Sequence, residues 1–378
     1  MNITPYLKLM ADKGASDLFF TTGAPVSMKI EGDTRAVGKS PLEPGMVRQI
    51  ADSIMTEDQR EEFAHELEMN LGMSLKGIGR YRINIYLQRG EVSMVIRYIK
   101  ANIPSMDQLT LPDKLKDIIL LKKGLILVVG STGSGKSTTL ASMIKHRSEA
   151  VSGHILTIED PIEFAFSHSK SIIGQREVGL DTRSYSNALR EAMREAPDVI
   201  MIGEARDEET MKAALSYADT GHLCLTTLHA VNANQTLDRV LSFFGSESNE
   251  QVLMDMSLNL RAIISQRLIQ SRDGKRVAAI EILINTPYIS ELIRKGEFGE
   301  IKEVMEKGSA EGMQTFDQSL YDLFKKGKID LKSALSNADS RSNLEWRINF
   351  GGEKEIDKAE GTEEMDFPSS MDDLPQVD

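Results

Sequence analysis

Cysteine is almost absent from the 378-residue sequence, which contains Cys224 alone. A single cysteine excludes an intrachain disulfide and a zinc site built from a cysteine cluster, and it suits a reducing cytoplasm. Long apolar runs are also missing: the longest candidate for a transmembrane helix, 118–129, is interrupted by Lys122 and Lys123. Because the N-terminus shows no charged start followed by an apolar stretch, we expect no secretory signal.

The chain lacks an excess of positive charge, since its formal net charge is −12. Residues 351–378 hold ten acidic residues and two lysines, so most of the negative charge lies in this tail. The acidic total argues against a nucleic-acid binder, although only weakly, because the remaining chain is close to neutral. A length of 378 residues with 40% hydrophobic and 27% charged residues predicts a soluble globular protein of two domains.

A glycine-rich segment carries the strongest functional signal. Residues 130–138 read GSTGSGKST, directly after the apolar run 125–129 and before a predicted helix. This pattern is typical of loops that cradle nucleotide phosphates with backbone N–H groups at a helix N-terminus. In such loops the lysine, here Lys136, reaches the β- and γ-phosphates, and the hydroxyl of Ser137 takes one position on Mg²⁺. The predicted phosphate-binding residues are Gly130, Ser131, Thr132, Gly133, Ser134, Gly135, Lys136, Ser137 and Thr138.

Strand and helix signals alternate from residue 124 onward, which predicts a parallel sheet covered by helices on both faces. The expected strands are 125–129, 154–159, 198–203, 222–228 and 277–284, with helices such as 182–195 and 208–219 between them. The expected domains are a smaller α+β domain over 1–99, a linker over 100–113, an α/β domain with a helical C-terminal part over 114–340, and an acidic, disordered tail over 341–378.

Carboxylates follow two of the predicted strands. Glu159, Asp160 and Glu163 come at the end of 154–159, and Glu204 follows 198–203. Ligands of open α/β sheets bind at the carboxyl ends of strands, where such acids would serve Mg²⁺ and an attacking water. The alternative for the first group is a solvated turn at Pro161.

Histidines and arginines give more ambiguous signals. His222 and His229 flank a strand and either are structural or sense the γ-phosphate, but at about 23 Å apart they cannot share a metal ion. The arginines of the N-terminal hairpin either form a charged face or reach a phosphate in trans. Those hairpin arginines are Arg80, Arg82, Arg89 and Arg97, and Arg176, Arg190 and Arg194 raise the same question in the second domain. The pair Arg206 and Asp207 reads as a surface ion pair, and Cys224 as a small core residue.

Four segments occur in a characteristic order: the phosphate loop, IEDPIE at 158–163, GEARD at 203–207 and TGHLCLTTLH at 220–229. They resemble the Walker A, Asp box, Walker B and His box of the secretion ATPase superfamily, over about residues 3–335. Within it the chain is similar to the type IV pilus retraction ATPases, the PilT/PilU group, and to the PilU branch in particular. The segment 288–294 reads YISELIR where the PilT branch has AIRNLIR, and the tail is acidic.

The resemblance implies a RecA-like P-loop ATPase domain with a PAS-like N-terminal domain, in a homo-hexamer that uses ATP and Mg²⁺. It implies that Glu163 polarises the attacking water and that Glu204 acts on Mg²⁺ through water, with Ser137 as the other metal residue. It also implies that His222 and His229 couple phosphate state to domain position. Arg80, Arg82 and Arg97 match arginines that approach the nucleotide.

The implied work is pilus retraction, and hence twitching motility, at the inner face of the cytoplasmic membrane. The implied partners are an inner-membrane pilus platform protein and a paralogous retraction ATPase. The altered segment 288–294 and the tail leave an alternative open, a regulatory nucleotide-binding subunit that docks on another motor. A nucleic-acid motor is disfavoured, because the sequence shows no basic stripe.

Overall fold

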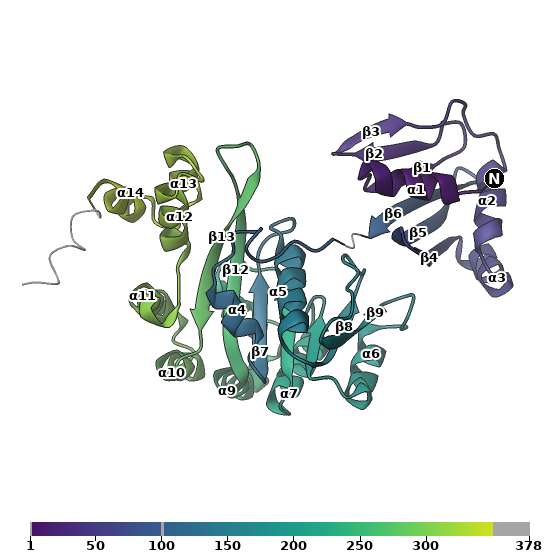
Figure 1. Cartoon of the computed structure of the whole chain (residues 1–378). Coiled ribbons are helices and arrows are strands. Elements are labelled where there is room, and N and C mark those ends of the chain that lie inside the picture. The colour runs from purple at the N-terminus through teal and green to yellow at the C-terminus, as the bar shows by residue number, and fades with distance from the viewer. Residues whose placement is uncertain (1, 100–101, 351–378) are drawn as a thin grey trace, which may run out of the picture.

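An antiparallel sheet forms the centre of the N-terminal unit (residues 2–99) in the computed structural model, which describes residues 2–99 and 102–350 (Figure 1). Its strands are β1 (Asp17–Phe20), β2 (Ser27–Ile30), β3 (Asp33–Ala36), β4 (Glu68–Leu75), β5 (Gly79–Gln88) and β6 (Glu91–Ile99), in the order β3-β2-β1-β6-β5-β4. Helices α1 (Thr4–Lys13), α2 (Met46–Ile54) and α3 (Glu57–Glu66) pack into the same core. In β5, buried Tyr81 and Ile83 alternate with Arg80 and Arg82, so these two arginines lie on the face away from that core.

A seven-stranded sheet forms the centre of the α/β unit (residues 114–350) and confirms the predicted α/β class. Its strands are β7 (Gly124–Val129), β8 (Gly153–Glu159), β9 (Ser171–Glu177), β10 (Val199–Ile202), β11 (Leu223–Leu228), β12 (Leu260–Gln270) and β13 (Arg276–Ile284). The order is β13-β12-β7-β11-β10-β8-β9, and every neighbouring pair is parallel except β12 and β13. Strands β7, β10 and β11 are buried throughout, as their apolar sequences predict for a sheet covered on both faces.

Alternate side chains of β7 enter two different clusters. Leu125 and Leu127 contribute to one, and Ile126 and Val128 to the other. The first cluster includes α6 (Tyr185–Ala192), α7 (Glu208–Asp219), α8 (Ala233–Leu241), α9 (Asn249–Asn259), α10 (Pro287–Lys295) and α11 (Ile301–Lys307), and the second includes α4 (Lys114–Ile119) and α5 (Lys136–Ala150). The helices of these two clusters leave the carboxyl ends of the parallel strands uncovered. The candidate functional residues come directly after those strand ends.

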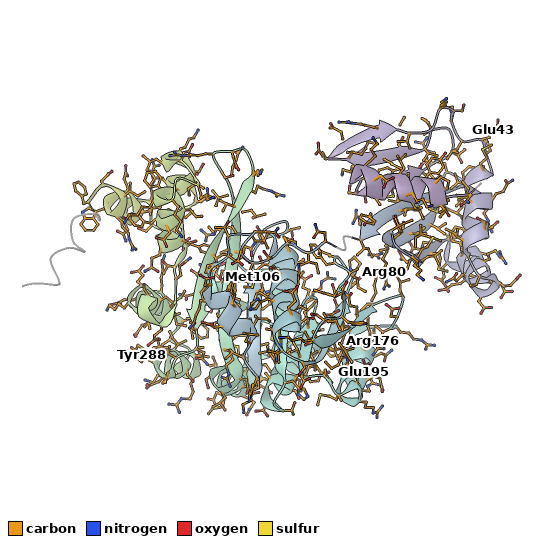
Figure 2. The ribbon with its side chains drawn as sticks, in the orientation of Figure 1. Glu43, Arg80, Met106, Arg176, Glu195 and Tyr288 are labelled. Carbon is orange, nitrogen blue, oxygen red and sulfur yellow. The ribbon has the colours of Figure 1, made fainter. Side chains whose placement is uncertain are left out.

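The segment predicted as a linker, 100–113, is described from residue 102. Ile103, Met106 and Leu111 are buried, and they join clusters that contain α5 (Met106 is labelled in Figure 2). The ammonium of Lys145 also donates a hydrogen bond to the carbonyl oxygen of Ile103 at 2.9 Å. The described part of this segment is therefore packed against the α/β unit.

The C-terminal helices lie against β12 and β13 and correct one expectation. They are α12 (Phe316–Lys325), α13 (Leu331–Asn337) and α14 (Arg341–Phe350). The expected disorder is wrong for residues 341–350, because they form α14 and bury Leu344 against Phe316 and Leu320. The remainder of the acidic tail, 351–378, lies outside the described residues. None of the helices in the described ranges is long and apolar enough to cross a membrane.

Candidate active site

The glycine-rich loop joins the end of β7 to the start of α5, as its sequence predicts. Gly133 and Gly135 have φ angles of +76° and +89°, a left-handed backbone conformation that favours glycine. The loop ends at the N-terminus of a 15-residue helix, where free N–H groups and the helix dipole attract anions. The ammonium of Lys136 donates to the carbonyl oxygens of Gly130 and Ser131 at 2.8 and 3.1 Å. Burial lowers the pKa of Lys136, while Glu204 and Glu163 oppose this effect.

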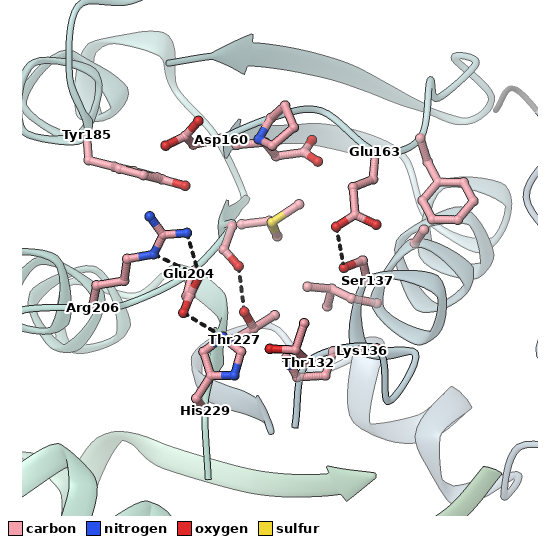
Figure 3. A pocket seen from close by; sticks show the side chains of 18 of the residues that line it. Thr132, Lys136, Ser137, Asp160, Glu163, Tyr185, Glu204, Arg206, Thr227 and His229 are labelled. Atoms are coloured by element: carbon pink, nitrogen blue, oxygen red, sulfur yellow. Dashed lines mark hydrogen bonds and ion pairs between the residues drawn. The ribbon is translucent and has the colours of Figure 1, made fainter. Parts of the chain in front are cut away.

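A cavity of ≈ 400 Å³ opens between this loop and the carboxyl ends of the sheet strands (Figure 3). It brings together residues that are far apart in the sequence. They include Thr132, Lys136 and Ser137 from the loop, Glu159, Asp160 and Glu163 after β8, Glu204 and Arg206 after β10, and Thr227 and His229 around the end of β11. The predicted convergence at the carboxyl ends of the strands is therefore present.

Glu163 and Ser137 lie next to each other on one side of the cavity. The hydroxyl of Ser137 donates to Oε1 of Glu163 at 2.9 Å (Figure 3). A hydroxyl next to carboxylates is a set of hard oxygen ligands, which suits Mg²⁺. The residues present therefore fit the divalent cation that a triphosphate would bring.

Glu204 contacts the side chains of His229 and Arg206 on the other side of the cavity. Its Oε1 lies 3.0 Å from Nε2 of His229, and its Oε2 accepts a hydrogen bond from Nε of Arg206 at 2.8 Å. The predicted surface pair of Arg206 and Asp207 is therefore wrong. Arg206 binds Glu204, while Asp207 caps α7 by accepting the N–H of Thr210 at 2.9 Å.

Glu159 differs from the other carboxylates that follow β8. It is 7% exposed, and its Oε1 accepts hydrogen bonds from the Thr157 hydroxyl at 2.7 Å and the Gln175 amide at 3.2 Å. Burial raises its pKa to about 7. Asp160 and Glu163 are exposed, so Glu159 is an inner carboxyl group that supports this turn.

The two predicted histidines lie at opposite ends of β11. His229 follows the carboxyl end and lines the cavity, whereas His222 precedes the amino end. Nδ1 of His222 lies 3.2 Å from the Tyr217 carbonyl oxygen and 3.2 Å from the Thr220 hydroxyl. The structure thus brings His229 to the site and leaves His222 at the opposite edge of the sheet.

Three arginines of the N-terminal hairpin, Arg80, Arg82 and Arg97, contact acidic residues of the same chain. Nη2 of Arg80 lies 3.6 Å from Oδ2 of Asp181, and Nε of Arg82 lies 3.6 Å from Oε1 of Glu177. Figure 2 shows Arg80 where the N-terminal unit meets the α/β unit. Within the N-terminal unit, Arg97 pairs with Asp17 at 2.8 Å. In the α/β unit, Arg176 pairs with Glu195 at 2.6 Å and Arg194 pairs with Glu191 at 2.7 Å.

Some residues around the loop were not predicted. Gln266 of β12 bonds to the loop, and Tyr185 and Thr227 line the cavity. A second cavity of ≈ 690 Å³ adjoins Gly135 and Thr138 and is bounded by 108–111 and the hairpin between β12 and β13. The one sequence signal for the residues around the second cavity is the presence of polar residues inside the apolar pattern of β12.

Cys224 is buried in β11, and burial raises its pKa, as expected for a core residue.

Comparisons with known proteins cover both units of the chain. The family model described as "Type II/IV secretion system protein" matches residues 3–318. The type IV pilus ATPase PilU of Pseudomonas aeruginosa is 50% identical over 358 residues, which are 94% of each chain. PilT of the same organism, named a type IV pilus retraction ATPase, is 41% identical over 344 residues, covering 91% of this chain and 100% of that one. A crystal structure of the pilus retraction motor PilT with bound ADP has a TM-score of 0.84 at 42% identity, covering 91% and 99%.

Proposed function

The chain belongs to the type II/IV secretion system protein family, as an ATPase of the PilT/PilU group, and from this we propose that it is a hexameric motor of type IV pilus retraction. One observation carries the proposal: Lys136, Ser137, Glu163, Glu204 and His229 all line a single cavity at the carboxyl ends of the strands. In this proposal the loop with Lys136 would bind the phosphates, Glu163 would activate water, and His229 beside Glu204 would respond to the γ-phosphate.

Each side chain has a defined part in the proposed hydrolysis. The loop N–H groups and Lys136 bind the phosphates, and Glu163 accepts a proton from the attacking water. Ser137 and Glu204 would hold Mg²⁺, which when bound would supply neutralisation of the phosphate charge. His229 and Arg206 fix both oxygens of Glu204, so a change at the γ-phosphate would reach the segment after β11. The nucleoside would occupy the second cavity, beyond Thr138.

The mechanical step belongs to the proposal as well. Hydrolysis and product release would change the angle between the N-terminal unit and the α/β unit. In a ring of six copies such changes would move a central partner, the inner-membrane platform protein, and remove pilin subunits from the pilus base. The proposed place of action is therefore the inner face of the cytoplasmic membrane.

Two substitutions test the assignment. We expect Lys136→Ala to abolish ATP hydrolysis and to weaken nucleotide binding by more than about tenfold, since it removes the charge that faces the phosphates. Glu163→Gln should abolish hydrolysis while leaving nucleotide affinity within about twofold, because the amide cannot accept the proton of the water.

Steady-state ATPase assays and binding of a fluorescent ADP derivative measure both effects. Lys123→Ala and Glu149→Gln, which make the same changes at exposed positions, serve as controls. Normal turnover by Glu163→Gln would refute its assignment as the residue that activates water.

One surface favours a second candidate function, a regulatory subunit that docks on a paralogous motor. Segment 288–294 lies in α10, where Tyr288 is 51% exposed (Figure 2) and Glu291 is paired with Lys295 at 2.8 Å. An exposed tyrosine at this point offers an apolar contact for another protein. ATPase activity of the purified chain, alone and mixed with a PilT-type paralogue, separates the two functions. Retraction in cells that carry this chain as the sole retraction ATPase would exclude the purely regulatory one.

A further inference from the structure

Gln266 of β12 lies against the phosphate loop and bonds to it with both ends of its amide group. Its Nε2 donates to the carbonyl oxygen of Ser134 at 2.8 Å, and its Oε1 accepts the hydroxyl of Thr139 at 2.7 Å. The side chain is only 3% exposed. Ser134 belongs to the loop and Thr139 to the first turn of α5, so a single side chain joins the two.

Two glycines of the loop, Gly130 and Gly135, are packed against the same residue. A β-carbon on Gly130 would lie 2.5 Å from the carbonyl oxygen of Gln266, and one on Gly135 would lie 2.7 Å from its Nε2. Both distances are far below ordinary van der Waals contact. Gln266 therefore fills the space that side chains at these two positions would need, and the loop follows its surface.

The hydrogen-bonding chemistry specifies glutamine. The carbonyl oxygen of Ser134 can only accept, so the NH₂ group must face it and the amide oxygen must face Thr139. A glutamate would place a carboxylate oxygen against the Ser134 carbonyl oxygen. A leucine would leave two buried polar groups without partners, which is more destabilising than the loss of two exposed bonds.

We propose that Gln266 is a positioning residue, which holds the phosphate loop in its phosphate-binding conformation. The proposal rests on the proposed function, since it requires that the loop bind a nucleotide. A loop ordered before binding loses less conformational entropy when phosphates arrive. Because Glu163 and Glu204 come from β8 and β10, the effect should fall on nucleotide affinity and KM, while kcat stays nearly unchanged.

The test compares Gln266→Glu with Gln270→Glu, the same change on the same strand at an exposed position. At pH 8 we expect Gln266→Glu to bind a fluorescent ADP derivative about tenfold more weakly, as for the loss of a buried hydrogen bond. Its kcat at saturating ATP should stay within about twofold of wild type. Burial raises the pKa of the new carboxyl group, so toward pH 6 its protonated form donates to Ser134 and the defect should shrink. Gln270→Glu should show neither effect.

Equal ADP affinity of wild type and Gln266→Glu at pH 8 would overturn the proposal. Failure of the wild-type chain to bind nucleotide would instead overturn the proposed function, so the two failures are distinguishable. If Gln266→Glu does not fold, Thr139→Val replaces it, because it removes one of the two bonds. Thr139→Val should weaken ADP binding about threefold, and Thr139→Ser, which keeps the hydroxyl, should not. Equal affinity of these two variants would also overturn the proposal.

Discussion

Glu281, on β13, is a carboxyl group buried beside the start of α8. Its Oε1 accepts the N–H of Ala233 at 2.8 Å and the hydroxyl of Ser265 at 2.9 Å, and the residue is 3% exposed. Burial raises its pKa from 4.5 to about 7, against the opposing effect of these hydrogen bonds. The carboxyl group of Glu281 therefore links two strands of the sheet to α8. Helix α8 follows the segment that contains His229, so this link lies behind the candidate site.

Glu281→Gln should change how folding stability depends on pH. The folded-state pKa lies above the unfolded value, so the folded chain binds an extra proton between pH 4.5 and about 7. The wild-type chain therefore loses stability as pH rises through this window, whereas glutamine keeps the accepting oxygen and has no charge. The variant should match wild type near pH 4, below the unfolded pKa, and exceed it by roughly 3 kcal/mol at pH 8. Urea unfolding at several pH values measures the difference, with Glu149→Gln as the exposed control. If the unfolding free energies of wild type and Glu281→Gln depend on pH in the same way, folding does not raise the pKa of Glu281.

The residues that we propose to act on phosphates could be located from the sequence, because that chemistry requires fixed residue types at fixed spacing. Lys136 and Ser137 follow from the loop pattern, and Glu163 and Glu204 from their places after apolar strands. Gln266 could not be predicted, since its partner Thr139 is 127 positions away and a glutamine in a strand is an ordinary surface residue elsewhere. The partner of Arg206 could not be predicted either. Its sequence neighbour Asp207 suggested an ion pair, but the Asp207 carboxylate caps α7 instead.

At the scale of elements, the C-terminal helices depend on few anchors. In α14, Leu344 is buried, while Trp346 and Phe350 are 56% and 60% exposed. The guanidinium of Arg267 lies 3.8 Å from the centre of the Phe316 ring and bonds to Asp339 at 2.8 Å, which ties β12 to this region. One buried residue in ten gives no helical periodicity, and this explains why the sequence predicted a disordered tail here.

Leu344→Ala should therefore loosen the whole C-terminal cluster. Removing a fully buried leucine side chain leaves a cavity against Phe316 and Leu320 and should lower the free energy of unfolding by about 3 kcal/mol. Trp346→Ala, about half a turn away and exposed, should lower it by less than about 1 kcal/mol. Urea unfolding followed by circular dichroism compares the two. Equal effects would mean that α14 is not held by Leu344.

The five strands predicted for the α/β unit match β7, β8, β10, β11 and β13 within one residue, whereas β9 and β12 were not predicted. The apolar runs of β7, β10 and β11 gave their strands within one residue, because a central parallel strand needs apolar side chains on both faces. Strand β9 lies at the edge of the sheet and mixes exposed Ile172 with polar Gln175 and Arg176, so its pattern resembles a loop. Strand β12 follows α9 without a turn residue between them and carries Ser265, Gln266 and Arg267 at its centre.

At the scale of the whole molecule, Glu177 of β9 connects the N-terminal unit to the segment that carries Glu163. Arg82 faces one oxygen of Glu177, and the other oxygen accepts the N–H of Ile162 at 3.4 Å. Ile162 directly precedes Glu163. One of the arginines that the sequence predicts to act in trans, Arg82, is thus linked through Glu177 to the site of its own chain. Two arrangements of a ring follow: arginine action within a subunit, or between subunits.

Mixing inactive subunits distinguishes these arrangements. One variant is Lys136→Ala, which keeps the arginines, and the other carries Arg80→Ala, Arg82→Ala and Arg97→Ala, which keeps the phosphate loop. If an arginine acts in trans, a complete site forms wherever an intact loop meets an intact arginine of its neighbour. In a closed ring assembled at random from equal amounts, about a quarter of the interfaces meet this condition, so about a quarter of wild-type ATPase activity should return. Lys136→Ala mixed with Glu163→Gln is the matched control: both residues line one cavity of one chain, so mixing should restore nothing. If the arginine mixture is as inactive as this control, although size measurements show mixed rings, the arginines act within their own subunit.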